Sequence, residues 1–305
     1  MLQRARSWVR PRSRSADVAP DPAPAREQRG SIRILGNDDL DEVMGLLLGS
    51  PLENIFVASR VEAAGLDPFM LGCQVIGYER DEQLVSLCHA GSNLVPVNAD
   101  DEALDAYIRY LGPRRRAASI MGVAGPTIRL WEGLSQAYGG QWSEVRDLRP
   151  DQPLMSISQT CTVWPDERVQ RITMKDFDSY FRAAVKMYTE EVGISPLEAT
   201  GSYRRHVQRT IEQGRAFGIV EDGRVVFKSD VGCHQGMFCQ VQGVWMDPAL
   251  RGRGRAAAAM SGVVELCRKR WPVVSLYVND YNTPAIRLYE RVGFQSVGKL
   301  ATVLY

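Results

Sequence analysis

The chain has 305 residues, 45% of them hydrophobic and 24% charged, with a formal net charge of +1 at pH 7. This length suits two domains, and no apolar run reaches the roughly 18 residues that a membrane span needs. A net charge so close to zero excludes a whole-molecule field that would attract nucleic acid or acidic lipid, so we expect neither as a partner.

The first thirty residues are rich in arginine and proline and have no apolar segment typical of a signal peptide. An Arg- and Ser-rich start also resembles an organelle transit peptide, but four prolines between residues 11 and 24 favour a disordered tail over residues 1–30. Six cysteines without paired spacing are typical of reduced core residues in a cytoplasmic protein.

The N-terminal half begins with a predicted strand at residues 32–35, followed by the sequence Asp39-Leu40-Asp41. A hairpin is predicted around residues 80–83, and a further strand at residues 94–97. The next helix is expected to begin near Glu102.

The C-terminal half begins with a predicted strand at residues 169–172 and a helix at 176–190, whose apolar side chains recur at helical spacing. An Asp-Gly pair at 222–223 predicts a hairpin between strands at 217–220 and 225–227. A central strand follows at 239–246, before an Asp-Pro pair.

The remaining elements are a helix at residues 256–270, a strand at 273–278 and a last helix with its own boundary signals. Thr283 is a good N-cap, Pro284 suits the first helical position, and Gly293 stands where a C′ glycine is expected. This order of strands and helices predicts a mixed α/β domain.

Short motifs occur in the same order in both halves. The clearest pair is IRLWE at residues 128–132 and IRLYE at 286–290. This order indicates tandem duplication, with the join near residues 152–164. We therefore predict a tail at 1–30, an N-terminal domain at 31–158 and a C-terminal domain at 159–305.

The loop RGRGRA at residues 251–256 lies between a predicted strand and a predicted helix. Unpaired N–H groups and the helix dipole make such a helix start an anion site, and glycines let the backbone approach a phosphate closely. A nucleic-acid-binding RGRG segment would recur in arrays, and the glycine spacing does not fit a dinucleotide-binding loop. A glycine turn with solvated arginines remains the plain alternative.

This loop resembles the acetyl-CoA motif of the GNAT acetyltransferase superfamily, Gln/Arg-x-x-Gly-x-Gly/Ala, which Arg251, Gly254 and Ala256 fill. Residues 279–294, NDYNTPAIRLYERVGF, resemble the second signature of that superfamily. The resemblance covers about residues 169–305. More loosely, the whole chain is similar to actinobacterial GNAT proteins with an N-terminal domain of unknown function, and its tandem layout is similar to that of mycothiol synthase.

The resemblance implies roles for residues of the C-terminal half. The backbone of Val244 and Met246 would pair with the pantetheine arm of acetyl-CoA, which Asn282 would also contact. Tyr289 would lie near the sulfur. The pyrophosphate would be held by the motif loop, with Arg251 and then Gly252, Arg253, Gly254, Arg255 and Ala256.

Acetyl transfer to an amine needs a proton for the departing thiolate and is helped by a base. The phenol of Tyr289 suits the first role, although its ring falls on an apolar helix face and could serve only as core filler. Glu190 and Glu191 are our candidates for the base, ahead of Asp230 and His234, because in the resembling family that helix end faces the acceptor. Each of the four could instead be a solvated surface group.

The N-terminal copy departs from the pattern at two positions that matter for coenzyme binding and for acetyl transfer. Its loop at residues 98–101, Asn-Ala-Asp-Asp, would repel a pyrophosphate, and Trp131 stands where the other half has Tyr289. We therefore expect a degenerate GNAT-like domain that binds no coenzyme and shapes the acceptor site or the domain interface.

These observations predict an acetyl-CoA-dependent N-acetyltransferase that acts by direct attack in a ternary complex, with acetyl-CoA as co-substrate and no metal. The acceptor would be an amine of a small molecule or a protein, and the oligomeric state is left open. One alternative is acetylation of a thiol-containing sugar amine, as in mycothiol synthase. The other is a non-catalytic acyl-CoA-binding sensor.

Overall fold

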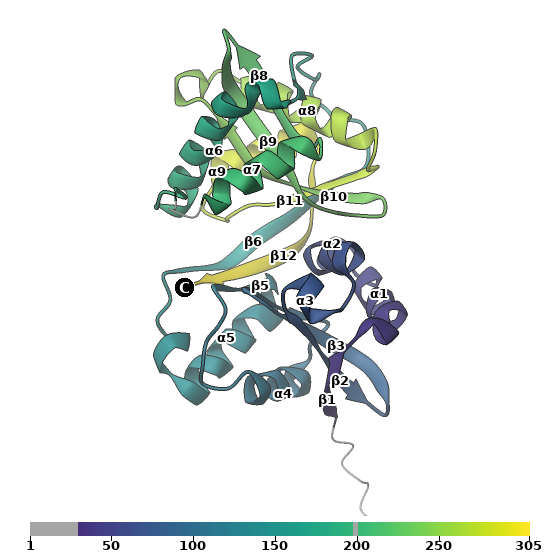
Figure 1. Cartoon of the computed structure of the whole chain (residues 1–305). Helices are drawn as coiled ribbons and strands as arrows, with labels where there is room; N and C mark the ends of the chain where they lie inside the picture. The colour runs from purple at the N-terminus through teal and green to yellow at the C-terminus, as the bar shows by residue number, and fades with distance from the viewer. Residues whose placement is uncertain (1–29, 198–200) are drawn as a thin grey trace, which may run out of the picture.

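The computed structural model describes residues 30–197 and 201–305, and these form a single mixed sheet flanked by helices (Figure 1). The twelve strands of the described chain lie in the order β1-β2-β3-β4-β5-β12-β6-β11-β10-β9-β8-β7. None of the described helices is long and apolar enough to cross a membrane. The predicted tail, apart from Gly30, lies outside the described residues.

The N-terminal half starts with the predicted strand, and a 3-10 turn, in which Asp39 accepts a hydrogen bond from the Gly36 amide at 2.7 Å, joins it to the first helix. Its elements are β1 (Ser31–Leu35), α1 (Leu40–Leu48), α2 (Ile55–Ala64), α3 (Pro68–Leu71), β2 (Gln74–Arg80), β3 (Gln83–Ala90), β4 (Asn93–Val97), α4 (Asp101–Leu111), β5 (Ser119–Val123), α5 (Ala124–Tyr138) and β6 (Asp147–Ile157).

The C-terminal half repeats this order, without a counterpart of α3 among its described residues. Its elements are β7 (Gln170–Arg171), α6 (Phe177–Val192), α7 (Ser202–Glu212), β8 (Ala216–Glu221), β9 (Arg224–Gln235), β10 (Phe238–Met246), α8 (Arg255–Arg268), β11 (Val273–Tyr277), α9 (Thr283–Val292) and β12 (Gln295–Leu304). The two halves agree in pairing as well, because β4 runs parallel to β5 and β10 runs parallel to β11.

Some predicted boundaries were wrong. The strand expected at 169–172 is only two residues long, whereas β9 continues to Gln235. Asp230 and His234, which lie beyond the end of the strand predicted at 225–227, are therefore both within β9. The N-cap of α9 is Asn282, not Thr283, because the Asn282 side chain accepts a hydrogen bond from the Ala285 amide at 3.3 Å. Gly293 ends this helix in the left-handed conformation, as predicted.

The two halves are joined by an exchange of their last strands. Strand β6 pairs with β11 of the C-terminal half, and β12 pairs with β5 of the N-terminal half. The exchanged strands also pair with each other, antiparallel, at the centre of the sheet. In Figure 1, β6 and β12 run side by side between the two groups of helices.

The cores follow this exchange. Met155 and Ile157 of β6 belong to the main core of the C-terminal half, whereas Val303 of β12 belongs to a core of the N-terminal half. All three are 2% exposed or less. Apolar burial of this kind stabilises a fold by about 1.5 to 3 kcal/mol per large side chain, so each half depends on a strand encoded by the other.

The sheet opens between β10 and β11. These strands pair only over residues 238–240 and 273–275, and β10 then carries a bulge at Gly243, whose φ is +59°. Fully buried Lys228 lies against this bulge and donates to the Gly243 carbonyl at 3.0 Å and to Asp230 at 2.6 Å. Within the described parts of the chain, the second half of β10 therefore has no strand partner on its β11 side.

Candidate functional site

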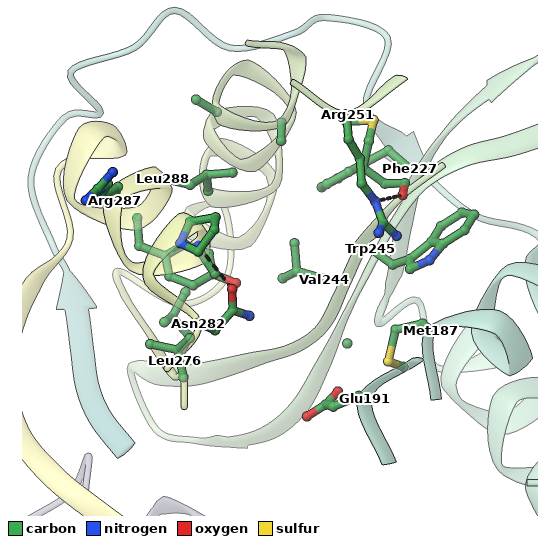
Figure 2. Close-up of a pocket in the computed structure, with 18 of the residues that line it drawn as sticks. Met187, Glu191, Phe227, Val244, Trp245, Arg251, Leu276, Asn282, Arg287 and Leu288 are labelled. Carbon is green, nitrogen blue, oxygen red and sulfur yellow. Dashed lines mark hydrogen bonds between the residues drawn. The ribbon is translucent and has the colours of Figure 1, made fainter. Parts of the chain in front are cut away.

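A cavity of about 840 Å³ fills the opening between β10 and β11. Its walls come from the second half of β10, the start of α8, the end of β11, the first turns of α9 and the C-terminal end of α6. Figure 2 shows Arg251 and Glu191 at opposite ends of this cavity, with Val244 between them and Asn282 and Leu288 along one side. The strand opening, the loop and the second signature thus meet in one place.

The loop at one end of the cavity has the geometry of an anion site. Gly252 and Gly254 have φ values of +74° and +72°, in the left-handed region that favours glycine. Gly254 is the N-cap of α8 and supplies no side-chain cap. The first N–H groups of α8 therefore have no partner within the helix and face outward at the positive end of its dipole.

The arginines of this loop are not equally available. Arg255 forms an ion pair with Glu221, and Arg251 binds Glu190 at 2.7 Å. Arg253 is exposed, and no ion pair links it to another described residue. The loop therefore offers one uncommitted guanidinium and two that already have carboxylate partners.

The exposed edge of β10 is only partly free. Val244 is half-buried and lines the cavity. The carbonyl of Met246 accepts a hydrogen bond from Nε of Arg251 at 2.9 Å, as the dashed line in Figure 2 shows. A ligand that paired with this carbonyl would have to share it with Arg251 or displace that side chain, a feature that the sequence pattern did not indicate.

Tyr289 lines the cavity but is only 7% exposed, and its ring packs edge-to-face against Phe294 at 5.9 Å. Burial, with a smaller contribution from Glu191, raises the pKa of the Tyr289 hydroxyl well above its ordinary value. The phenol therefore keeps its proton at neutral pH. At neutral pH it can act only as a proton donor and not as a base, although the raised pKa makes it a weaker acid than an ordinary phenol.

Of the candidate bases, Glu190 is already engaged. Its carboxylate accepts hydrogen bonds from Arg251 at 2.7 Å and from the indole N–H of Trp245 at 3.1 Å. Glu191 lines the cavity with a half-exposed side chain, and its nearest ion-pair partner is Arg149 at 3.7 Å. Between these two carboxylates, the one less constrained by hydrogen bonds is Glu191.

The other two candidates do not line the cavity. Asp230 is held by Lys228 and by the Tyr180 hydroxyl, behind the bulge of β10. His234 stacks on Trp271 with ring centroids 5.2 Å apart, and its amide faces Ser59 of α2 at 3.5 Å. Asp230 is therefore a structural partner of Lys228, and His234 belongs to the contact between the halves.

Several polar residues of the cavity escaped the sequence interpretation. Gln152 comes from β6, at the edge of the segment taken for the join, and Tyr281 and Asn279 precede α9. Arg149, also from β6, does not line the cavity but lies 3.7 Å from Glu191, which does. Burial lowers the pKa of Arg149, but Asp147, Tyr281 and Glu191 outweigh this effect and raise the pKa overall. The segment 147–157, DLRPDQPLMSI, contains two prolines and no regular polar/apolar alternation, so no local signal indicated the strand.

The equivalent region of the N-terminal half is closed by its own side chains. Asp100 caps α4 by accepting from the Ala103 amide at 3.0 Å, and Arg80 pairs with Asp100 at 2.9 Å. The indole N–H of Trp131 donates to the Trp142 carbonyl at 3.2 Å. The helix start that an anion would use is thus occupied by a carboxylate, and the residue matching Tyr289 has a structural partner.

Comparisons with known proteins agree with this architecture. The model of the acetyltransferase (GNAT) family matches residues 177–294, and that of a domain of unknown function, DUF4081, matches residues 73–180. A search of curated proteins finds no match.

Solved structures share the fold at low sequence identity. A GCN5-related N-acetyltransferase from Sphaerobacter thermophilus has a TM-score of 0.58 at 16% identity, covering 90% of this chain and 95% of its own. A GNAT acetyltransferase from Colwellia psychrerythraea has a TM-score of 0.53 at 11% identity, covering 90% and 99%. A tandem GNAT protein from the clavulanic acid biosynthesis pathway has a TM-score of 0.51 at 14% identity, covering 90% and 98%.

The family match falls on the half that carries the uncapped helix start and the open strand edge, and the likeness to the solved structures extends over the whole chain. The chain is therefore a GNAT-fold protein in which a DUF4081 domain precedes a domain of the acetyltransferase (GNAT) family.

Proposed function

We propose that the protein is an N-acetyltransferase that uses acetyl-CoA and transfers the acetyl group to a primary amine. The reaction would take place in the cavity of the C-terminal half. The uncapped start of α8 at Gly254, next to the open strand edge of β10, is the observation that carries this proposal. The cavity between them can accept a long coenzyme with a charged diphosphate at one end and an amide-containing arm beyond it.

The residues present fit such a coenzyme. The amides opening α8 and the side chain of Arg253 would hold the diphosphate, and Val244 offers backbone groups to the pantetheine arm. The side-chain oxygen of Asn282 caps α9, so its amide N–H groups remain for the ligand. On coenzyme binding, Arg251 would give up its hydrogen bonds to the Met246 carbonyl and the Glu190 carboxylate and bind the diphosphate, because phosphate oxygens are strong acceptors for a guanidinium.

Acetyl-CoA would supply the acetyl group as a thioester, and the amine nitrogen would attack its carbonyl carbon directly as the bond to sulfur breaks. Glu191 would bind the amine and draw off its proton, directly or through water. Tyr289 would hold the proton that the departing thiolate takes up. Both side chains line the same cavity, as direct attack in a ternary complex requires.

Calorimetry with CoA tests the coenzyme site. Gly254→Glu adds a side chain and a negative charge at the start of α8 and should weaken binding about tenfold or more. Gly236→Glu is the matched control, because Gly236 is also exposed, has a φ of +51° and has nothing within 4 Å of a Cβ. Equal CoA affinity in the two variants would remove the basis of the proposal.

The same titration counts the sites. We expect one CoA per chain, because Asp100 occupies the helix start in the N-terminal half. Thiol release from acetyl-CoA in the presence of amines then separates an enzyme from a sensor. Tight CoA binding with no acetylated product from any amine would favour the sensor.

A further inference from the structure

A buried chain of hydrogen bonds leads from the centre of the sheet to the cavity. Thr302 of β12 donates to Oε1 of Gln152 at 2.7 Å, and Nε2 of Gln152 donates to Oδ1 of Asn279 at 2.8 Å. Nδ2 of Asn279 then donates to the hydroxyl oxygen of Tyr281 at 2.8 Å. Gln152 and Asn279 are 2% and 9% exposed, so neither amide can exchange its partners freely with water.

A bulge in β6 explains why Gln152 reaches this place. Leu300 and Thr302 of β12, two positions apart, face Gln152 and Arg149 of β6, three positions apart. The extra residue lets the side chains at 149 and 152 point to the same side of the strand. Gln152 then reaches the Asn279 side chain, and Arg149 reaches Glu191.

The direction of this chain fixes the role of the last hydroxyl. Asn279 gives its N–H to Tyr281, so the Tyr281 oxygen accepts and its own hydrogen is not consumed by the chain. Tyr281 is 66% exposed and lines the cavity together with Glu191. The hydroxyl of this exposed tyrosine is therefore oriented from its acceptor side by Asn279, whose own position is set by the buried hydrogen bond from Gln152.

We propose that Tyr281 is a substrate-binding residue whose hydroxyl donates a hydrogen bond to an oxygen of the amine acceptor, with Gln152 and Asn279 as its positioning residues. This inference rests on the proposed function. Arg149 lies beside both Tyr281 and Glu191, which places the two groups at the same end of the cavity. The acceptor class is thus a primary amine that also bears a carbonyl, hydroxyl or carboxylate oxygen.

Two substitutions remove the donated hydrogen in different ways. Tyr281→Phe deletes the hydroxyl. Gln152→Glu keeps the shape but cannot donate, so Asn279 must turn its N–H toward residue 152 and its oxygen toward Tyr281. The Tyr281 hydroxyl would then donate to Asn279 and present no hydrogen to the acceptor.

The experiment measures acetyl transfer by the full chain to glycinamide and to a peptide with a free N-terminus, which carry oxygens, and to spermidine, which carries none. Each single substitution should raise KM for the oxygen-bearing amines about tenfold, leaving KM for acetyl-CoA and transfer to spermidine within about twofold. Gln152→Glu should add nothing to Tyr281→Phe. Tyr110→Phe, an exposed tyrosine outside the cavity, is the matched control.

Each outcome decides a separate question. If the unaltered protein does not bind CoA, the proposed function itself is overturned. CoA binding with transfer to spermidine alone, or to no amine, overturns the Tyr281 subsite, as does an unchanged amine KM in Tyr281→Phe. If Gln152→Glu is too unstable to purify, the Tyr281→Phe result stands alone and still decides.

Discussion

Arg149 of β6 holds the C-terminal end of α6 through Glu191, with Nη2 3.3 Å from the Glu191 carbonyl oxygen and Nη1 3.7 Å from its side-chain Oε1. The guanidinium is anchored from the other side by Asp147 at 2.8 Å and is only 8% exposed. A cation at a helix C-terminus also satisfies the carbonyls that end the helix. A strand of the N-terminal half therefore fixes a carboxylate in the cavity of the C-terminal half.

Replacing Arg149 by Met should raise KM for the amine several-fold and lower the free energy of unfolding by about 1 to 2 kcal/mol, because Asp147 and Glu191 are partly exposed and regain water. Urea unfolding and steady-state kinetics measure the two effects. Arg149→Lys keeps the charge but loses the planar, forked guanidinium. Its amine KM and its free energy of unfolding should lie between those of the unaltered protein and of Arg149→Met. Unchanged amine kinetics in Arg149→Met would show that Glu191 is not held by this contact.

Tyr289→Phe should lower kcat about a hundredfold and leave the dissociation constant for CoA unchanged. The burial that raises the pKa of this phenol keeps its proton in place at neutral pH, and Phe preserves the packing against Phe294. Single-turnover rates and calorimetry on the same preparations make the comparison. An unaltered rate would assign the ring to the core and leave the departing thiolate to be protonated by water.

The sequence allowed the residues at the α8 and α9 side of the cavity to be predicted, but not the polar residues that β6 contributes. Residues 251–256 and 279–294 are contiguous motifs, so local order alone located Gly254, Tyr289 and Asn282 in their elements. Gln152 and Asn279 are 127 positions apart and meet only because β6 crosses into the other half. Similarly, spacing could not reveal that Glu190 is bound to Arg251, 61 positions away.

Acid should destabilise the N-terminal half through His89, which is 2% exposed and contacts Cys73 at 3.1 Å and the Asn93 carbonyl at 3.0 Å. Burial is the main reason that the pKa of His89 lies below its ordinary value near 6.5. The unfolded chain therefore binds a proton more readily, and stability present above pH 6.5 is lost as pH falls from there toward the folded pKa.

Urea unfolding at pH 7 and pH 5 checks this expectation. His89→Gln should reduce the difference in unfolding free energy between the two pH values, because glutamine does not titrate. His234→Gln is the comparison, since burial also lowers the pKa of His234 but its ring is less enclosed. A pH dependence that survives His89→Gln intact would assign the acid sensitivity to other groups.

The exchange of β6 and β12 predicts where the chain can be cut. Residues 159–305 alone lack β6, so β11 and β12 lose the strand that lies between them. Leu154, Met155 and Ile157, each 2% exposed or less, would leave the interior. At about 1.5 to 3 kcal/mol per side chain, this loss is comparable to the whole stability of a typical domain, about 5 to 15 kcal/mol.

A fragment of residues 159–305 should therefore be unfolded or insoluble, whereas a fragment of residues 145–305, which restores β6, should unfold cooperatively in urea when followed by circular dichroism. The longer fragment still exposes the edge of β12 that β5 covers in the full chain, so we expect it to be less stable than the full chain and prone to association. Cooperative unfolding of the shorter fragment would contradict the prediction, because it would mean that β11 and β12 close the sheet without the strand between them.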